Sequence, residues 1–106
     1  MPKFTRKPKK QGHYVFVDTK QFETAMQELL NRYSVVGLSK QLACHYTTVY
    51  RWWRGEADQT AIDMDTGKKV LTTRIHSDLL HRILALHKKV TKQEATITTI
   101  NAKKDN

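Results

Sequence analysis

The chain has 106 residues and carries 19 Lys and Arg against 10 Asp and Glu, which gives a formal net charge of +9. A chain of this length is expected to form a single domain, and self-repulsion of that size is usually kept only where a polyanion such as nucleic acid offsets it. We expect no membrane association, because no apolar run approaches the roughly 20 residues that span a bilayer and no apolar leader opens the chain. The single cysteine excludes an internal disulfide.

The N-terminal residues 1–12 contain five Lys or Arg and two Pro without a periodic apolar pattern. Such a segment has too few apolar side chains to offset the entropy of ordering, so it is predicted to be a flexible basic arm. Residues 13–18 are rich in β-forming side chains. They are few in number, which is typical of either an edge strand or an extended lead-in to a helix.

Two helices are predicted next. The first covers residues 19–33, where apolar side chains recur at helical spacing and Asp18 or Thr19 can serve as the N-cap. The second covers residues 35–43 and follows Ser34, a favourable N-cap residue. Its apolar side is narrow, so this helix needs neighbours to be stable.

A third helix is predicted over residues 46–54. Val49 and Trp52 group on one side of it, and Gly55 is suited to end it. We expect Trp52 to be a core residue. Trp53 is expected to pack beneath a later helix or hairpin rather than against a nucleic-acid base.

Two short β-like runs, residues 60–64 and 69–73, flank the sequence Asp-Thr-Gly-Lys at 65–68. These four residues have the chemistry of a hairpin turn, so the segment is interpreted either as a hairpin or as a surface loop.

A last helix is predicted over about 76–92, starting at His76 or Ser77, with an apolar seam at four- and three-residue spacing. The seam consists of Leu79, Ile83, Leu86 and Val90. Residues 93–106 lack an apolar helix face and are predicted to be a flexible tail. Residues 13–92 then form the one domain.

Residues 38–56 read Leu-Ser-Lys-Gln-Leu-Ala-Cys-His-Tyr-Thr-Thr-Val-Tyr-Arg-Trp-Trp-Arg-Gly-Glu. Two helices that cross near a right angle over a short turn need small side chains at the crossing, here Ser39 and Ala43, and an apolar pair that anchors the second helix, here Val49 and Trp52. The stretch resembles the helix-turn-helix of Cro/CI-type phage repressors and small bacterial regulators. That family usually has Gly where this chain has Ala43. A shifted turn or another turn type would avoid the cost of about 1 kcal/mol of a left-handed Ala.

The resemblance implies a mainly α fold. It predicts a three-helix core with the helix-turn-helix over about 34–54. The apolar spacing adds the C-terminal helix over about 76–92, and the turn chemistry adds either a small β-hairpin wing or a loop between them. The likeness extends over Thr19 to Gly55 if the first helix is the supporting one.

The resemblance also implies that the second helix of the motif enters the major groove of double-stranded DNA. Arg51 is the best candidate for reading sequence, because its planar guanidinium can pair with both acceptors on a guanine edge. The residues expected at base edges are His45, Tyr46, Thr47, Tyr50 and Arg51. The alternatives are a phosphate contact or a solvated position for Arg51 and a helix-cap role for Thr47.

Other polar and basic side chains are expected to contact the DNA backbone and neutralise phosphates. They are Lys3, Arg6, Lys7, Lys9, Lys10, Lys40, Thr48, Arg54, Lys68 and Lys69. Flexible basic arms can also enter a minor groove. The alternative for the arm is a solubilising tail, and for the two hairpin lysines a surface loop.

A homodimer on two half-sites is expected, because one helix-turn-helix buries too small an interface for a tight specific site. The seam of Leu79, Ile83, Leu86 and Val90 is expected to pair with its copy. The alternative is that the same face closes the core of the monomer.

No residue pattern predicts a metal, a cofactor, a small-molecule substrate or enzyme activity. The five histidines lack the short paired spacing of a zinc site. Cys44 and His45 are chain neighbours rather than a positioned nucleophile and base, and there is no Gly-rich phosphate loop.

We therefore expect a cytoplasmic, nucleoid-associated transcriptional regulator, a repressor or activator of phage-like type that blocks or recruits RNA polymerase. One alternative is an excisionase-like or DNA-packaging accessory protein with a winged helix-turn-helix, which would bend the duplex. The other is an RNA-binding module, which would prefer single-stranded RNA.

Overall fold

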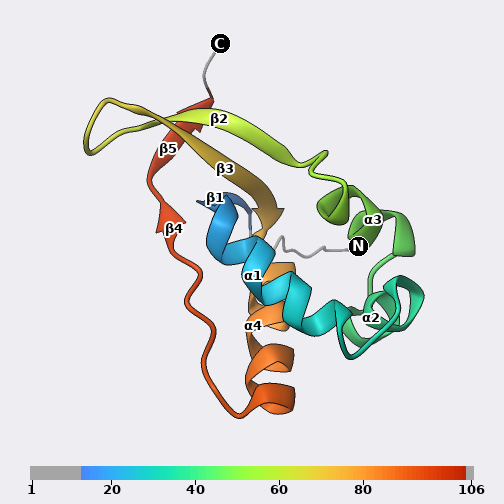
Figure 1. Cartoon of the computed structure of the whole chain (residues 1–106). Helices are drawn as coiled ribbons and strands as arrows, with labels where there is room; N and C mark the ends of the chain where they lie inside the picture. Colours follow the sequence, from blue (N-terminus) through green and yellow to red (C-terminus); the bar gives the residue numbers. More distant parts are fainter. Residues whose placement is uncertain (1–12, 105–106) are drawn as a thin grey trace, which may run out of the picture.

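The computed structural model describes residues 13–104, and in that range it contains four α-helices and five β-strands (Figure 1). The strands form one antiparallel sheet in the order β4-β1-β3-β2-β5. The mainly α fold expected from the sequence is therefore wrong, because the β-formers assemble into a curled five-stranded sheet instead of one small hairpin. Within the described range, no helix combines the length and apolar content needed to cross a bilayer.

The sheet is built around a long strand, β3 (Lys69–His76), which pairs with strands on both sides. One neighbour is β2 (Asp58–Asp63), so the predicted hairpin is confirmed and is longer than expected. The other is β1 (Tyr14–Asp18), which also pairs with β4 and is therefore a strand inside the sheet and not at its edge; it leads directly into the first helix. β1 and β3 lie far apart in the chain, so no local pattern reveals their pairing.

The C-terminal segment joins the two edges of the sheet. β4 (Thr99–Ile100) pairs with β1, and β5 (Ala102–Lys104) pairs with β2. One short stretch of chain thus runs from one edge to the other and curls the sheet (Figure 1). The flexible tail predicted over 93–106 is wrong for these residues, because Ile100 lies opposite Phe16 as an apolar cross-strand pair.

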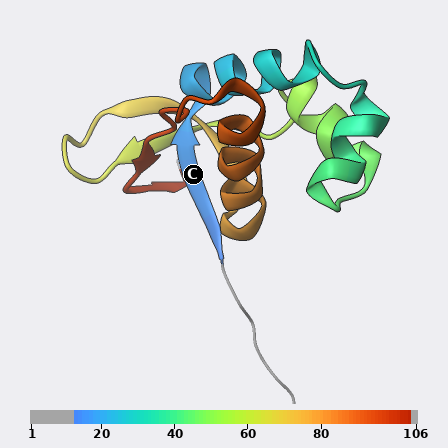
Figure 2. The same ribbon diagram turned by 90° about the horizontal axis from the view of Figure 1, so that it is seen from below.

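The helices occupy the positions that their caps and apolar spacing predict. α1 (Thr19–Leu30) begins after Asp18, and α2 (Val35–Leu42) begins after Ser34. Both cap side chains accept a hydrogen bond from a backbone N–H in the first turn, at 3.1 Å and 3.0 Å respectively. α3 (Tyr46–Trp53) follows after a short turn. In Figure 2 the α2 and α3 pair lies on the side of α1 and α4 (Ser77–Thr91) that is opposite the β2–β3 turn.

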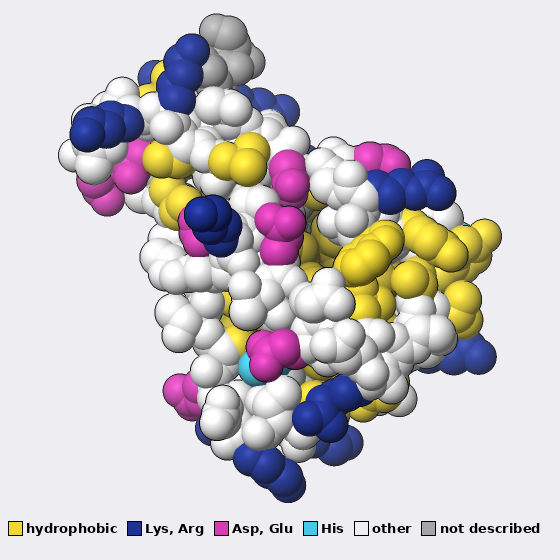
Figure 3. Space-filling model, in the orientation of Figure 1, with side chains coloured by type: hydrophobic (Ala, Val, Ile, Leu, Met, Phe, Trp, Pro, Cys, Tyr) yellow, Lys and Arg dark blue, Asp and Glu magenta, His cyan; other side chains and the backbone are white. Residues whose placement is uncertain are grey.

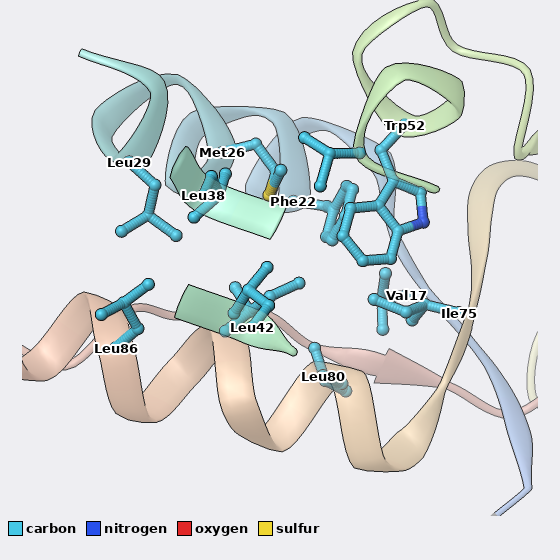
Figure 4. Close-up of a cluster of buried hydrophobic side chains, with 12 residues drawn as sticks. Val17, Phe22, Met26, Leu29, Leu38, Leu42, Trp52, Ile75, Leu80 and Leu86 are labelled. Carbon is cyan, nitrogen blue, oxygen red and sulfur yellow. The ribbon is translucent and has the colours of Figure 1, made fainter. Parts of the chain in front are cut away.

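One hydrophobic core joins the helices to the sheet (Figure 4). It receives side chains from β1, all four helices and β3. The buried members are Val17, Phe22, Met26, Leu29, Leu38, Leu42, Val49, Trp52, Ile75, Leu80, Ile83 and Leu86.

This core corrects the expected dimer seam on α4 (Ser77–Thr91). Ile83 is fully buried and Leu86 is nearly so, while Leu79 and Val90 pack half-buried against the same core. The seam closes the monomer against α1 and α2, which is the alternative that the sequence left open. The homodimer stays a prediction, and the buried Ile83 and Leu86 are not available to it.

Candidate nucleic-acid interface

The turn between α2 and α3 has a left-handed residue at its start. Ala43 has φ 55° and ψ 45°, the conformation that Gly adopts most easily. Its N–H donates to the carbonyl of Lys40 at 3.2 Å, and the next N–H, of Cys44, donates to Ser39 at 3.0 Å. The turn is therefore neither shifted nor of another type. These bonds fix the direction in which α3 leaves α2.

A contact from α4 braces the same turn. Arg82 Nη1 donates to the carbonyl oxygen of Leu42, the last residue of α2, at 3.1 Å. A cation at the C-terminal end of a helix also interacts favourably with the helix dipole. The end of α2 is thus held by the turn and by a helix from the far part of the sequence.

The inner side of α3 is anchored as the sequence predicts. Val49 is fully buried, and Trp52 is 8% exposed and meets Phe22 edge to face at a ring distance of 5.6 Å. The small residue at the crossing, Ser39, is buried and donates its hydroxyl to the carbonyl of Val36 at 2.6 Å. Rotation of α3 about its axis is therefore restricted.

Trp53 differs from expectation. It is 54% exposed and packs beneath neither α4 nor the hairpin. The next position on a helix is turned by about 100°, so burial of Trp52 carries Trp53 away from the core. It borders a small cleft beside Phe22 and Met26 of α1. Figure 3 shows apolar side chains gathered on this face of the molecule, over α3.

The outer side of α3 is open to solvent. The exposed residues here are the five predicted base-reading residues, His45, Tyr46, Thr47, Tyr50 and Arg51, together with Arg54. Thr48, predicted to contact the backbone, is half-buried at the flank of this face. The structure thus brings the predicted reading residues together on one surface.

A ladder of ring contacts runs along this surface. His45 stacks on Tyr46 at 4.6 Å, Tyr46 meets Tyr50 edge to face at 6.2 Å, and the Arg54 guanidinium lies 5.4 Å from the centre of the Tyr50 ring. Arg54 also forms an exposed ion pair with Glu56 at 3.7 Å. Arg54 is therefore held against the helix surface.

His45 also caps α3. Its Nδ1 accepts from the backbone N–H of Thr47 at 3.3 Å and lies 2.8 Å from the Thr47 hydroxyl oxygen. These two residues therefore stabilise the start of the helix. Arg51 differs from them, because among residues 13–104 its side chain has no hydrogen bond, ion pair or ring contact. Its five N–H donors are free for a ligand.

A polar groove of about 350 Å³ lies beside this face. Arg51 and Thr48 line one wall, and Arg74 of β3 and Tyr14 of β1 line another. The Arg74 guanidinium lies 4.0 Å from the centre of the Tyr14 ring. Sequence reasoning did not place Arg74 at the site, and only the pairing of β1 with β3 could have done so.

The remaining predicted backbone contacts are scattered. Lys40 is exposed on α2. Lys68 and Lys69 lie at the turn between β2 and β3, at the opposite end of the molecule from α3 in both ribbon views (Figures 1 and 2). The structure therefore does not bring these lysines beside α3 as a wing. The arm residues Lys3, Arg6, Lys7, Lys9 and Lys10 lie outside the described residues.

Cys44 lies half-buried in the turn between α2 and α3. Burial raises the pKa of its thiol, and the nearby Arg82 guanidinium partly opposes that rise. Among residues 13–104, no group of three His, Cys, Asp or Glu side chains is placed to hold a metal ion.

Comparison with protein-family models, curated proteins and solved structures finds no match to the chain.

Proposed function

We propose that this protein binds double-stranded DNA sequence-specifically, with α3 in the major groove. One observation carries the proposal: α3 is anchored by Val49 and Trp52 on one side and presents an exposed, unpaired Arg51 on the other. The formal net charge of +9 supports a polyanionic partner.

The dimensions of α3 fit this role. An α-helix with its side chains is about 10–12 Å in diameter, and the major groove is about 12 Å wide. Arg51 can pair in a bidentate manner with a guanine, and Tyr50 adds apolar area for a thymine methyl group. Arg54, already held by Tyr50, is positioned for a phosphate.

We further propose a role as a transcriptional regulator. The β2–β3 hairpin directly follows α3 in the chain, as a winged accessory protein would require, but its turn lies at the far end of the molecule. This distance weighs against the winged excisionase-like alternative. A dimer on two half-sites stays part of the proposal, on a surface other than the α4 seam.

Selection of bound sites from a random duplex pool tests the proposal, followed by affinity measurements on the selected duplex and a scrambled one. Arg51→Ala should cost about 1–3 kcal/mol on the selected duplex and little on the scrambled one. Lys40→Ala is the matched control, because loss of a phosphate contact should weaken both duplexes alike. If no sequence motif emerges, if Arg51→Ala weakens both duplexes equally, or if single-stranded RNA is preferred, the proposal is wrong.

A further inference from the structure

The groove beside α3 adds a second contact to the surface already described. We propose that it seats the phosphate backbone of the DNA strand that passes the Arg51 side of α3, with Arg74 as the phosphate-binding residue. This inference rests on the proposed function and extends it from base reading to the positioning of the duplex.

Arg74 is prepared for such a contact. Its side chain is exposed and its guanidinium lies over the Tyr14 ring at 4.0 Å, while its backbone N–H donates to Ala57 at 3.1 Å. Tyr14 is itself held edge to face by His76 at 5.3 Å. A guanidinium stacked on a ring keeps its in-plane N–H donors, and little rotamer freedom is left to lose when a phosphate binds.

The groove lies where a DNA strand must pass. Thr48 and Arg51 are three residues apart on α3, so they share one flank of the helix. A helix in the major groove has a sugar-phosphate backbone on each side of it. The strand on this flank therefore runs past Arg51 toward the wall that carries Arg74.

The charges of the groove limit what can occupy it. Besides Arg51 and Arg74, it is lined by Glu56 and Asp58. Glu56 pairs with Arg54, and the Asp58 carboxylate accepts from the Thr73 hydroxyl at 2.7 Å. The formal charges of two arginines and two carboxylates cancel, so the groove should hold a free anion poorly. A phosphate of a duplex that is already bound to α3 needs to contact only the Arg74 guanidinium and not the two carboxylates.

Arg74→Gln is the test variant, and Lys89→Gln is the matched control. Lys89 is exposed in the last turn of α4, whereas the groove is lined by Leu79 near the start of that helix. Arg74→Gln should weaken binding about tenfold and make the slope of log affinity against log salt less negative by about 0.9. The preferred sequence should not change, and Lys89→Gln should behave as the wild type. Circular dichroism and the unfolding midpoint show that each variant is folded.

Duplexes with single neutral methylphosphonates identify the phosphate. At one phosphate position, the methylphosphonate should weaken binding of the wild type but not of Arg74→Gln. At the other positions where it weakens the wild type, it should weaken Arg74→Gln as well. Wild-type affinity and salt slope in Arg74→Gln would overturn the inference, as would an Arg74 side-chain resonance that shifts with millimolar inorganic phosphate alone. Failure of the wild type to bind any duplex would instead remove the proposed function.

Discussion

Ala43 at the α2–α3 turn provides a test of how the turn is held. Its φ of 55° places an L residue in the left-handed region, which costs about 1–2 kcal/mol relative to Gly. A Gly at this position would avoid that cost. It would also lose more backbone entropy on folding, which offsets about 0.4–1 kcal/mol of the stabilisation. Ala43 is exposed, so its methyl group contributes little packing. Ala43→Gly should therefore raise the free energy of unfolding by about 0.5–1 kcal/mol.

The matched control is Ala85→Gly, an exposed alanine inside α4. There the helix conformation suits Ala, so the same substitution should lower the free energy of unfolding by about 1 kcal/mol. Urea unfolding followed by tryptophan fluorescence measures both variants against the wild type. The two changes should have opposite signs. If Ala43→Gly destabilises the protein as Ala85→Gly does, the turn is not left-handed at residue 43 and the orientation of α3 must be reconsidered.

Three further predictions concern the sheet, a buried polar link and the cysteine. Deletion of residues 99–106 should lower the free energy of unfolding by about 2–4 kcal/mol. The reason is that β4 pairs with β1 and β5 with β2, and each backbone hydrogen bond contributes about 1 kcal/mol. A urea midpoint equal to that of the wild type would refute this. Thr73→Val should cost about 1–3 kcal/mol, since the buried hydroxyl joins Thr19 and Asp58 at 3.0 Å and 2.7 Å, and unchanged thermal unfolding would contradict it. Burial raises the pKa of Cys44, so the folded state holds the thiol proton more tightly and stability should decline as the pH rises through the folded-state value. Alkylation by iodoacetamide should accordingly begin at higher pH in the native protein than in urea, and identical pH profiles would exclude the shift.

The helices could be predicted because their signals are local. Asp18 and Ser34 cap the first turns of α1 and α2 as their side-chain chemistry indicates. The inward position of Val49 and Trp52 follows from the 3.6-residue period. The same period places Trp53 outside the core, where the structure has it, so the predicted packing of Trp53 beneath another element is wrong.

The sheet could not be predicted because its pairing is not local. Phe16 lies opposite both Arg74 and Ile100, residues from distant parts of the chain. The C-terminal strands are two and three residues long, too short for a period-2 pattern to be recognised. The same pairing brings Arg74 to the groove, so the position of Arg51 could be predicted and that of Arg74 could not.

The apolar face of α4 shows another limit of prediction from residue spacing. Its four- and three-residue spacing identifies an apolar helix face but not the element that covers it. In the fold, α1 and α2 cover that face, and Ile83 becomes a core residue. At Ala43 a local preference is overridden. Ala alone disfavours the left-handed conformation, but the packing of α2 against α3 holds residue 43 in it.

The most direct test of the central claim is to titrate the ¹⁵N-labelled protein with its selected duplex and follow the amide resonances. We predict that the largest shifts fall on α3, at Thr47, Tyr50 and Arg51, with little change at Lys89 in the last turn of α4. Shifts confined to the β2–β3 turn around Lys68, with α3 unaffected, would contradict the account.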